Sequence, residues 1–176
     1  MKAGKSPAVG PLPPGLPAGR HRIRDRDRLR EVIERLAGLP ERNLEVLFPT
    51  LDPDLFDRPR LQQVLRLRIA RRRRLQVRIL VRDLDESLRR GHRLVALARE
   101  FPSHAAIRRL EASTRERLDE CFLIVDERCC LHRRPLNDPD TLLCCDGTPL
   151  PRSLRHRFDA LWEPAETPTE LRRLYL

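Results

Sequence analysis

The chain has 176 residues, and its 36 Lys and Arg residues outnumber its 26 Asp and Glu residues, so the formal net charge is +10. This length fits one domain of ordinary size. The longest uninterrupted apolar runs, such as Phe122 to Val125, are strand-sized and far below the ~18 residues of a membrane-spanning helix. The sequence therefore predicts that this is not an integral membrane protein.

The first 24 residues differ in composition from the rest of the chain. They hold five of the 16 prolines, four of the seven glycines and five basic residues without an acid. Such a segment buries too little apolar surface to offset its ordering entropy, so we expect a disordered basic tail over residues 1–24. It also lacks the apolar core of a secretory signal, and five cysteines, an odd number, are not typical of a secreted disulfide scaffold. These features predict a cytoplasmic protein.

From residue 25 on, the apolar spacing predicts alternating helices and strands. Leu29, Val32, Ile33 and Leu36 follow the i, i+3, i+4, i+7 pattern of a helix, and the apolar run 120–126 has the length of a buried strand. In the same way we predict helices over 25–37, 59–74, 86–101 and 150–162, and strands over 43–48, 75–81, 104–110, 120–126, 128–133 and 141–145. This order predicts a single α/β domain over residues 25–165, with a mixed β-sheet flanked by helices on both faces, and a C-terminal extension over 166–176.

The segment 119–126 carries part of a known motif. In the phospholipase D superfamily, each half of the fold has a strand with the pattern His-x-Lys-x4-Asp, and here the apolar core and the last acid, Asp126, match this pattern. Asp119 and Cys121 stand in place of the histidine and the lysine. A later strand and a last helix follow at the expected distances. The chain therefore resembles a single phospholipase D-like half over roughly residues 44–163.

The two replaced residues decide what the resemblance implies about catalysis. Enzymes of this superfamily attack a phosphodiester with the histidine and stabilise the developing charge with lysines. A carboxylate at Asp119 repels a substrate phosphate, and the thiol of Cys121 carries no fixed positive charge. We therefore expect a pseudoenzyme, a non-catalytic binding or accessory domain of unknown specific role that uses no cofactor. A hydrolase with another nucleophile, such as Cys121 or His92, is the remaining alternative.

Other segments resemble an uncharacterised bacterial domain of this class, which occurs alone or fused behind an N-acetyltransferase domain. The similar segments are Leu51-Asp52-Pro53, the strand 77–81 and the run 91–99. This resemblance implies an acetyltransferase domain as a candidate partner. Because superfamily enzymes pair two halves, a lone half has a sheet edge or face to cover, and we expect a homodimer on that ground.

Residues 58–82 carry ten arginines and no acid. Such a run of one charge attracts phosphate-bearing partners, so an electrostatic binder of nucleic acid or anionic lipid, acting through this segment and the basic tail, is the alternative function. The same arginines are also expected on a solvated helix face that binds nothing. With one tryptophan and one tyrosine in the chain, nucleic-acid binding would depend on the phosphate backbone rather than on base stacking.

Five residues are the candidate ligand-binding residues: Arg78, Asp83, His92, Arg109 and Arg133. Asp83 follows the strand 75–81 closely, where α/β proteins place ligand contacts, although an acid there also caps helices. His92 lies in the predicted helix 86–101, close to where a crevice at the sheet edge would form, and is otherwise a surface or capping residue. Arg133, with its neighbour Arg134, would join Arg78 and Arg109 in a cationic cleft, or these are separate surface arginines.

The cysteines include two adjacent pairs, Cys129-Cys130 and Cys144-Cys145. Adjacent residues of a strand point to opposite faces, so neither pair has the Cys-x2-4-Cys spacing of a zinc site. We expect buried cysteines that act as small apolar residues and no metal, with a cross-strand disulfide or a redox role as the alternative. The chain after residue 24 has only three glycines, which excludes a glycine-rich phosphate loop.

Overall fold

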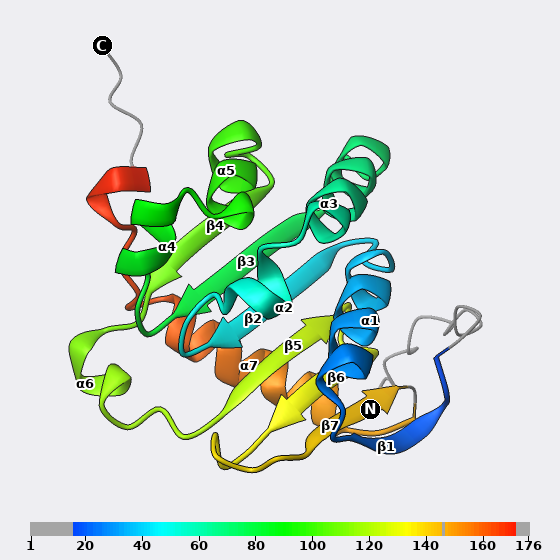
Figure 1. Ribbon diagram of the computed structural model, residues 1–176. Coiled ribbons are helices and arrows are strands. Elements are labelled where there is room, and N and C mark those ends of the chain that lie inside the picture. The colour runs from blue at the N-terminus through cyan, green and yellow to red at the C-terminus, as the bar shows by residue number, and fades with distance from the viewer. Residues whose placement is uncertain (1–15, 146, 172–176) are drawn as a thin grey trace, which may run out of the picture.

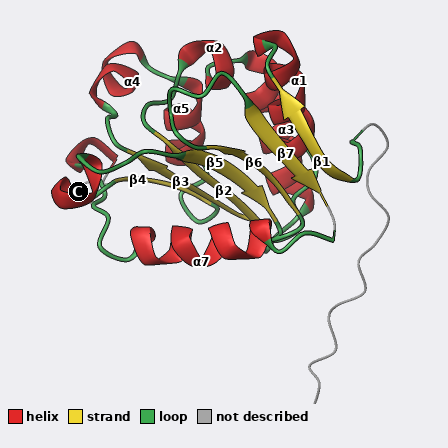
Figure 2. Cartoon of the chain, turned by 90° about the horizontal axis from the view of Figure 1, so that it is seen from below, coloured by secondary structure: helices red, strands yellow, loops and turns green. Residues whose placement is uncertain are grey.

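The computed structural model describes residues 16–145 and 147–171, which form one seven-stranded sheet with helices on both faces (Figures 1 and 2). The expected fold class, a mixed β-sheet flanked by helices, is confirmed. The elements follow in the order β1 (Gly19–Ile23), α1 (Arg26–Ala37), β2 (Asn43–Phe48), α2 (Pro53–Phe56), α3 (Pro59–Arg71), β3 (Gln76–Val81), α4 (Asp85–Arg90), α5 (Arg93–Glu100), β4 (Ala105–Arg109), α6 (Ala112–Arg115), β5 (Cys121–Val125), β6 (Cys129–Arg133), β7 (Thr141–Cys145), α7 (Leu150–Trp162) and the 3-10 helix η1 (Thr169–Leu171).

The sheet combines a parallel part with an antiparallel part. Its strand order is β1-β7-β6-β5-β2-β3-β4. Strands β2, β3 and β4 run parallel, whereas β5, β6, β7 and β1 are joined by antiparallel pairing, with β5 also antiparallel to β2. The carboxyl ends of the three parallel strands therefore lie at the same end of the sheet as the start of β5. We call this end of the sheet the carboxyl edge. The opposite edge, the amino edge, holds the starts of β2 and β3 and the turn between β5 and β6.

The two faces of the sheet are covered unequally. Helices α1, α3 and α5 lie on one face, while α7 is the one helix of the described residues that crosses the other face (Figure 2). Side chains alternate between the faces along each strand, so Leu123 of β5 joins the core under the three helices and Phe122 joins the core under α7. From α7, Phe158 and Trp162 stack at 5.6 Å between ring centroids and pack into the second core. Burial of aromatic side chains of this size, at about 1.5–3 kcal/mol each, holds α7 on the sheet.

Local sequence explains where α1 begins and which side it buries. The Asp25 carboxylate accepts a hydrogen bond of 2.7 Å from the Arg28 N–H and caps the helix, and Gly38 ends it. The apolar stripe predicted from the sequence is the stripe that packs into the core. Its members are Leu29, Val32, Ile33 and Leu36.

The structure corrects the boundary of the predicted tail. Residues 19–23, which we expected to be disordered, form β1, and β1 pairs along its length with β7. Pairing of its backbone with β7 supplies hydrogen bonds that composition does not reveal, and it places Ile23 in the core. Residues 1–15 of the predicted tail lie outside the described residues.

The structure also corrects the predicted helix 86–101, which consists of two helices. Gly91 has a left-handed φ of 70° and ends α4, and His92 caps α5. A left-handed residue cannot continue a helix, and glycine adopts this conformation at little cost. The short elements α2, α6 and η1 had no counterpart among the predicted elements.

The segment predicted as a C-terminal extension is joined to the domain as far as residue 171. The Glu166 N–H donates to the Arg109 carbonyl at 2.9 Å, and the Arg109 N–H donates to the Glu166 carbonyl at 2.8 Å. Helix η1 then lies against α5. Residues 172–176 lie outside the described residues. Within the described ranges, none of the helices combines the length and the apolar character needed to cross a membrane.

Candidate functional site

The degenerate motif lies on β5, with its first two positions at the carboxyl edge. The Asp119 carboxylate accepts a hydrogen bond of 3.0 Å from the Arg134 guanidinium. Cys121 is 4% exposed, and burial raises the pKa of its thiol to about 11. Because the thiolate is the nucleophilic form of cysteine, a thiol with this pKa is poorly reactive near neutral pH. These two positions offer neither an activated nucleophile nor a fixed cation.

The third motif position, Asp126, makes structural contacts at the amino edge. It lies in the turn between β5 and β6 with a left-handed φ of 49°. Its carboxylate accepts hydrogen bonds from the N–H groups of Glu41, Arg42 and Asn43, at 2.7, 2.9 and 2.8 Å. Asp126 therefore fixes the start of β2 against the turn that follows β5.

Arg78 lies half-buried under α7 rather than in an open cleft. Its guanidinium is 3.2 Å from the carboxylate of Glu45 and 2.7 Å from that of Asp159. It also lies 5.0 Å from the ring centroid of Phe158, a cation–π distance. The charge of Arg78 is therefore engaged inside the protein.

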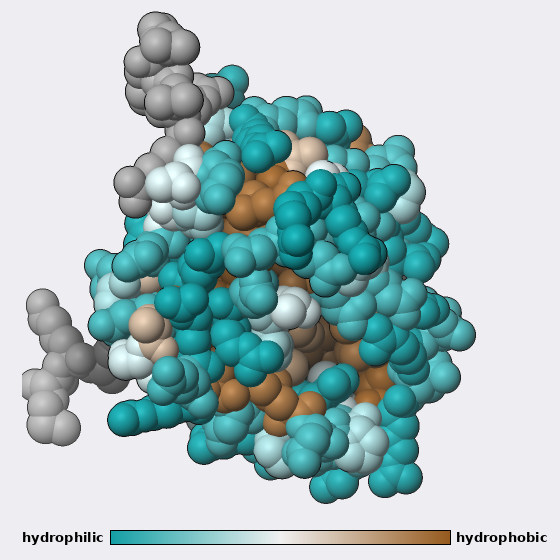
Figure 3. Space-filling model, turned by 60° about the vertical axis from the view of Figure 1, so that its left-hand side comes forward, coloured by the Kyte–Doolittle hydropathy of each residue, from teal (hydrophilic) through white to brown (hydrophobic). Residues whose placement is uncertain are grey.

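Asp83 and Arg109 meet at a shared neighbour, Asp85, where α4 begins. The Asp83 carboxylate accepts the Asp85 N–H at 3.0 Å, and Arg109 forms an ion pair with the Asp85 carboxylate. The N-cap position of α4 is Leu84, so Asp83 contacts the first residue of the helix without being its N-cap. A shallow hollow of about 570 Å³ lies beside them, lined by Asp85, Leu88, Arg89, Arg99 and Glu170. On the side where α4 and η1 lie, Figure 3 shows a mostly hydrophilic surface with apolar side chains in its recesses.

His92 and Arg133 each form hydrogen bonds with neighbouring groups of the protein. His92 is 2% exposed, and its Nδ1 accepts the Leu94 N–H at 3.1 Å. Burial lowers the pKa of this imidazole, which suits the neutral form that accepts the capping hydrogen bond. Arg133 donates twice to the Thr141 hydroxyl, at 3.0 and 2.7 Å. The structure therefore does not gather the five candidate ligand-binding residues into one site.

A buried carboxylate that the sequence analysis did not single out lies under α7. Glu45 of β2 is fully buried, and its Oε1 is 2.8 Å from Arg155 and 3.2 Å from Arg78. Desolvation raises the pKa of Glu45 from 4.5 to about 7, although the two arginines act to lower it. The signal in the sequence is an acid inside the otherwise apolar strand Asn43–Phe48, because a buried acid needs partners.

A second buried carboxylate, Glu120, lies directly before β5. Its Oε2 is 2.9 Å from Nε2 of His132, and it forms an ion pair with Arg157 of α7. Burial acts to raise the pKa of Glu120, but His132 and Arg157 hold it below the ordinary value. The two carboxylates attach α7 to the sheet by ion pairs as well as by apolar contacts.

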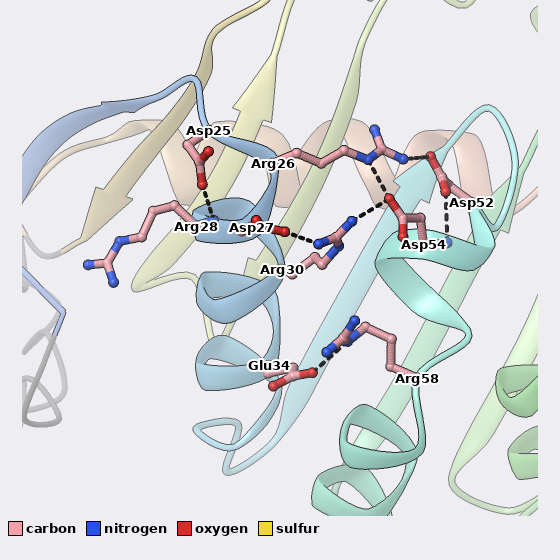
Figure 4. A network of polar contacts seen from close by, with 9 residues as sticks. All are labelled: Asp25, Arg26, Asp27, Arg28, Arg30, Glu34, Asp52, Asp54 and Arg58. Atoms are coloured by element: carbon pink, nitrogen blue, oxygen red, sulfur yellow. Dashed lines mark hydrogen bonds and ion pairs between the residues drawn. The ribbon is translucent and has the colours of Figure 1, made fainter.

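A surface ion network ties α1 to α2 (Figure 4). Arg26 and Arg30 contact the Asp54 carboxylate at 2.7 and 2.6 Å. Asp52 caps α2 by accepting the Asp54 N–H at 2.9 Å and also pairs with Arg26. The segment Leu51-Asp52-Pro53 is therefore the start of a helix held against α1.

The four paired cysteines lie opposite one another on β6 and β7. Cys129 is in register with Cys145, and Cys130 is in register with Cys144. All five cysteines lie in the described ranges as buried thiols without a disulfide. Burial raises the pKa of Cys130 well above its ordinary value. Among the described residues, no group of three or more His, Cys, Asp or Glu side chains is arranged to hold a metal ion.

The structure divides the ten arginines of residues 58–82 into two groups. The first group is engaged: Arg58 and Arg60 with Glu34, Arg66 with Glu100, Arg68 with the carbonyls of Leu39 and Pro40, Arg72 with Glu41, and Arg78 under α7. The second group comprises Arg71, Arg73, Arg74 and Arg82, which are exposed and form no ion pair or side-chain hydrogen bond within the described part of the chain. Much of the charge run is therefore used for internal contacts.

Six arginines belong to the end of α3, the loop before β3 and the residue before β2, all at the amino edge. Figure 1 shows where α3 ends. We call them the amino-edge arginine cluster: Arg42, Arg68, Arg71, Arg72, Arg73 and Arg74. The pairing of Arg72 with Glu41 at 3.1 Å joins the end of α3 to the loop before Arg42. Burial lowers the pKa of Arg68, and the neighbouring charges of Arg72 and Arg71 lower it further.

The acids near this cluster are already engaged. Glu41 pairs with Arg72, and Asp126 accepts three backbone N–H groups. The cluster is separated from the first two motif positions by about the length of a strand, roughly 20 Å. The cationic surface and the degenerate motif are thus at opposite edges of the sheet.

Comparison with known proteins places the fold among solved structures. TrmBL2, described as an archaeal chromatin protein with a novel mode of DNA binding, has a TM-score of 0.63 and 15% identity, over 89% of this chain and 57% of that chain. NucT from Helicobacter pylori has a TM-score of 0.57 and 9% identity, over 85% of this chain and 98% of that chain. At these identities the similarity is one of fold. No curated protein matches the chain.

One protein-family model matches the sequence itself. It covers residues 25–174, which include α1 to α7 and exclude β1. The chain therefore belongs to the family described as Domain of unknown function (DUF7931).

Proposed function

We propose that the protein is a non-catalytic, phospholipase D-like domain that binds phosphate-bearing polyanions at the amino-edge arginine cluster. The observation that carries this proposal is the exposure of Arg71, Arg73 and Arg74 without an ion pair in the described part of the chain. An exposed guanidinium of this kind donates two parallel hydrogen bonds to a phosphate without breaking an internal contact first.

The side chains at the motif positions support the non-catalytic part of the proposal. Asp119 is paired with Arg134, and Cys121 is a buried thiol with a raised pKa. The alternative nucleophile, His92, is buried and caps α5. The phospholipase D-like assignment rests on the motif of β5.

The electrostatics of the amino edge support polyanion binding. The cluster gathers six cations, and its two nearby acids are engaged by Arg72 and by backbone N–H groups. Such a local excess of one charge attracts polyanions and raises association rates. The DNA-binding activity stated for TrmBL2 shows that a protein with a related fold binds this class of ligand.

The test is a charge-neutralising triple variant, R71Q/R73Q/R74Q, of the full chain. Binding to a short DNA duplex and to long-chain polyphosphate is measured by fluorescence anisotropy between about 50 and about 200 mM salt. Loss of three phosphate contacts lowers the salt slope on the duplex by about 3 and the affinity near physiological salt by roughly 100-fold. The recovered duplex is expected to be uncleaved.

The matched control is R82Q/R89Q/R117Q, which removes the same charge from exposed arginines outside the cluster. This control keeps most of the affinity if the cluster is the binding site. Equal losses in the two triple variants would show that net charge alone drives binding, and they would refute the assignment of the site.

The basic tail is tested separately. A deletion for this purpose removes residues 1–15 only, because β1 begins at Gly19 and completes the sheet. This deletion removes Lys2 and Lys5, and we expect a smaller loss of affinity than in the triple variant. The acetyltransferase partner and the homodimer stay predictions from the resemblance.

A further inference from the structure

We propose that the polyanion is double-stranded nucleic acid, contacted along its sugar–phosphate backbone by the amino-edge arginine cluster. This inference rests on the proposed function and names its ligand class. Four properties of the cluster and its surroundings favour this ligand: its shape, the position of the aromatic side chains, the position of the exposed apolar side chains and the way its backbone is held.

The cluster lies on an open surface. Arg71, Arg72, Arg73 and Arg74 are all exposed, and they occupy the end of α3 and the loop before β3. The shallow hollow described above lies elsewhere, between α4, α5 and η1. Sites for small ligands are concave and enclose most of the ligand. An open row of guanidinium groups instead suits a ligand that presents many phosphates in series.

The aromatic side chains argue against a single strand. Within the described ranges, Phe48, Phe56, Phe122, Phe158 and Trp162 are buried, and Phe101 is partly buried. Single-stranded nucleic acid gains about 1–3 kcal/mol per base by stacking on exposed aromatic rings. The described surface offers no such platform, so the phosphates must supply the affinity.

The apolar surface argues against a membrane. Leu67 is the one large hydrophobic residue of the described ranges that is exposed, at 50%. A helix that binds a membrane surface inserts a whole apolar face, whereas the outer face of α3 around Leu67 carries Gln63, Arg66 and Arg71. An anionic vesicle would therefore be held by charge alone.

The backbone under the cluster is fixed before any ligand binds. Asp126 holds the N–H groups of residues 41–43, and Arg68 donates to the carbonyls of Leu39 and Pro40 at 2.8 and 2.7 Å. A fixed backbone suits a stiff ligand, because binding then orders the arginine side chains without also ordering the loop that carries Arg42. A duplex is stiff and carries one charge per about 1.7 Å of its axis, which is a higher linear charge density than that of a single strand.

The experiment compares three probes with the same full-length protein: a DNA duplex, a single strand of equal length that cannot fold, and phosphatidylserine vesicles. We expect at least a tenfold preference for the duplex over the single strand near physiological salt. The logarithm of affinity should fall with the logarithm of salt with a slope of about −4.5 to −5.5, as for about 5 or 6 phosphate contacts. Changing the duplex sequence should alter the affinity less than threefold.

The outcomes separate this inference from the proposed function. If R71Q/R73Q/R74Q weakens binding but the single strand or the vesicles bind as tightly as the duplex, the cluster is the site and the ligand class is wrong. If the triple variant binds like R82Q/R89Q/R117Q, the proposed function itself fails. A strong preference for one duplex sequence over another would show that the protein contacts the bases. It would also overturn the inference that binding is to the sugar–phosphate backbone.

Discussion

The substitution Glu45→Gln tests whether desolvation of a buried carboxylate sets the pH dependence of stability. Glu45 is fully buried under α7, and desolvation raises its pKa from 4.5 to about 7. A carboxyl group with a raised pKa binds its proton more tightly in the folded state. Its ionisation therefore lowers the free energy of unfolding as the pH rises from 4.5 to about 7, and the full penalty is present above pH 7.

The size of the penalty follows from the two pKa values. A difference of about 2.5 between the folded and unfolded pKa corresponds to about 3 kcal/mol. Glutamine has the same shape and carries no charge at any pH, so the variant lacks this dependence. The free energy of unfolding of Glu45→Gln, relative to that of the wild-type protein, should thus rise by about 3 kcal/mol between pH 4.5 and pH 8.

The assay is urea unfolding of both proteins at several pH values, followed by circular dichroism. All other ionisable groups are present in both proteins. The difference between the two plots of unfolding free energy against pH therefore reports the ionisation of Glu45. Glu31→Gln, at an exposed position of α1, is the matched control for loss of one carboxylate, and it should change the free energy of unfolding by less than about 1 kcal/mol. A flat difference curve for Glu45→Gln would refute the reasoning, because it would mean that Arg78 and Arg155 fully compensate the desolvation.

Two further predictions concern Asp126 and the cysteines. Asp126→Ala removes the acceptor of three backbone N–H groups and should lower the free energy of unfolding by about 2–4 kcal/mol. Glu127→Ala, in the same turn and also at positive φ, should cost less than about 1 kcal/mol, and equal costs in urea unfolding would contradict the role of the Asp126 carboxylate. The five buried thiols should resist maleimide in the folded protein and all react in denaturant. Rapid labelling of folded protein, read by mass spectrometry, would count against buried apolar roles for Cys130 and Cys144.

Some helices and strands can be predicted from the local sequence alone, and others cannot. The apolar stripe of α1 and the strand Asn43–Phe48 lie where the spacing predicts them, because both bury a continuous apolar surface. The helix break at Gly91 depends on a single left-handed residue, which periodicity does not detect. Strand β1 has a single buried residue, Ile23, and it forms through its backbone pairing with β7.

For the candidate sites too, some features are visible in the local sequence and others depend on contacts between distant elements. The motif on β5 and the arginine run are visible in the sequence, and they led to the two function hypotheses. The position of each relative to the other is a property of the sheet, in which the antiparallel pairing of β5 with β2 sends Cys121 and Asp126 to opposite edges. The sequence likewise shows Glu45 as an acid in an apolar strand, but Arg78 and Arg155 come from a neighbouring strand and a distant helix.

By itself, the sequence determined the class of fold and most of its elements, since apolar periodicity is a local property that each segment carries. Only the tertiary structure decided which arginines are engaged and which are exposed, because their acidic and carbonyl partners lie on other elements. The proposed function depends on the exposed guanidinium groups of Arg71, Arg73 and Arg74. Within residues 16–145 and 147–171 they form no ion pair, and they are what remains after those long-range contacts have formed.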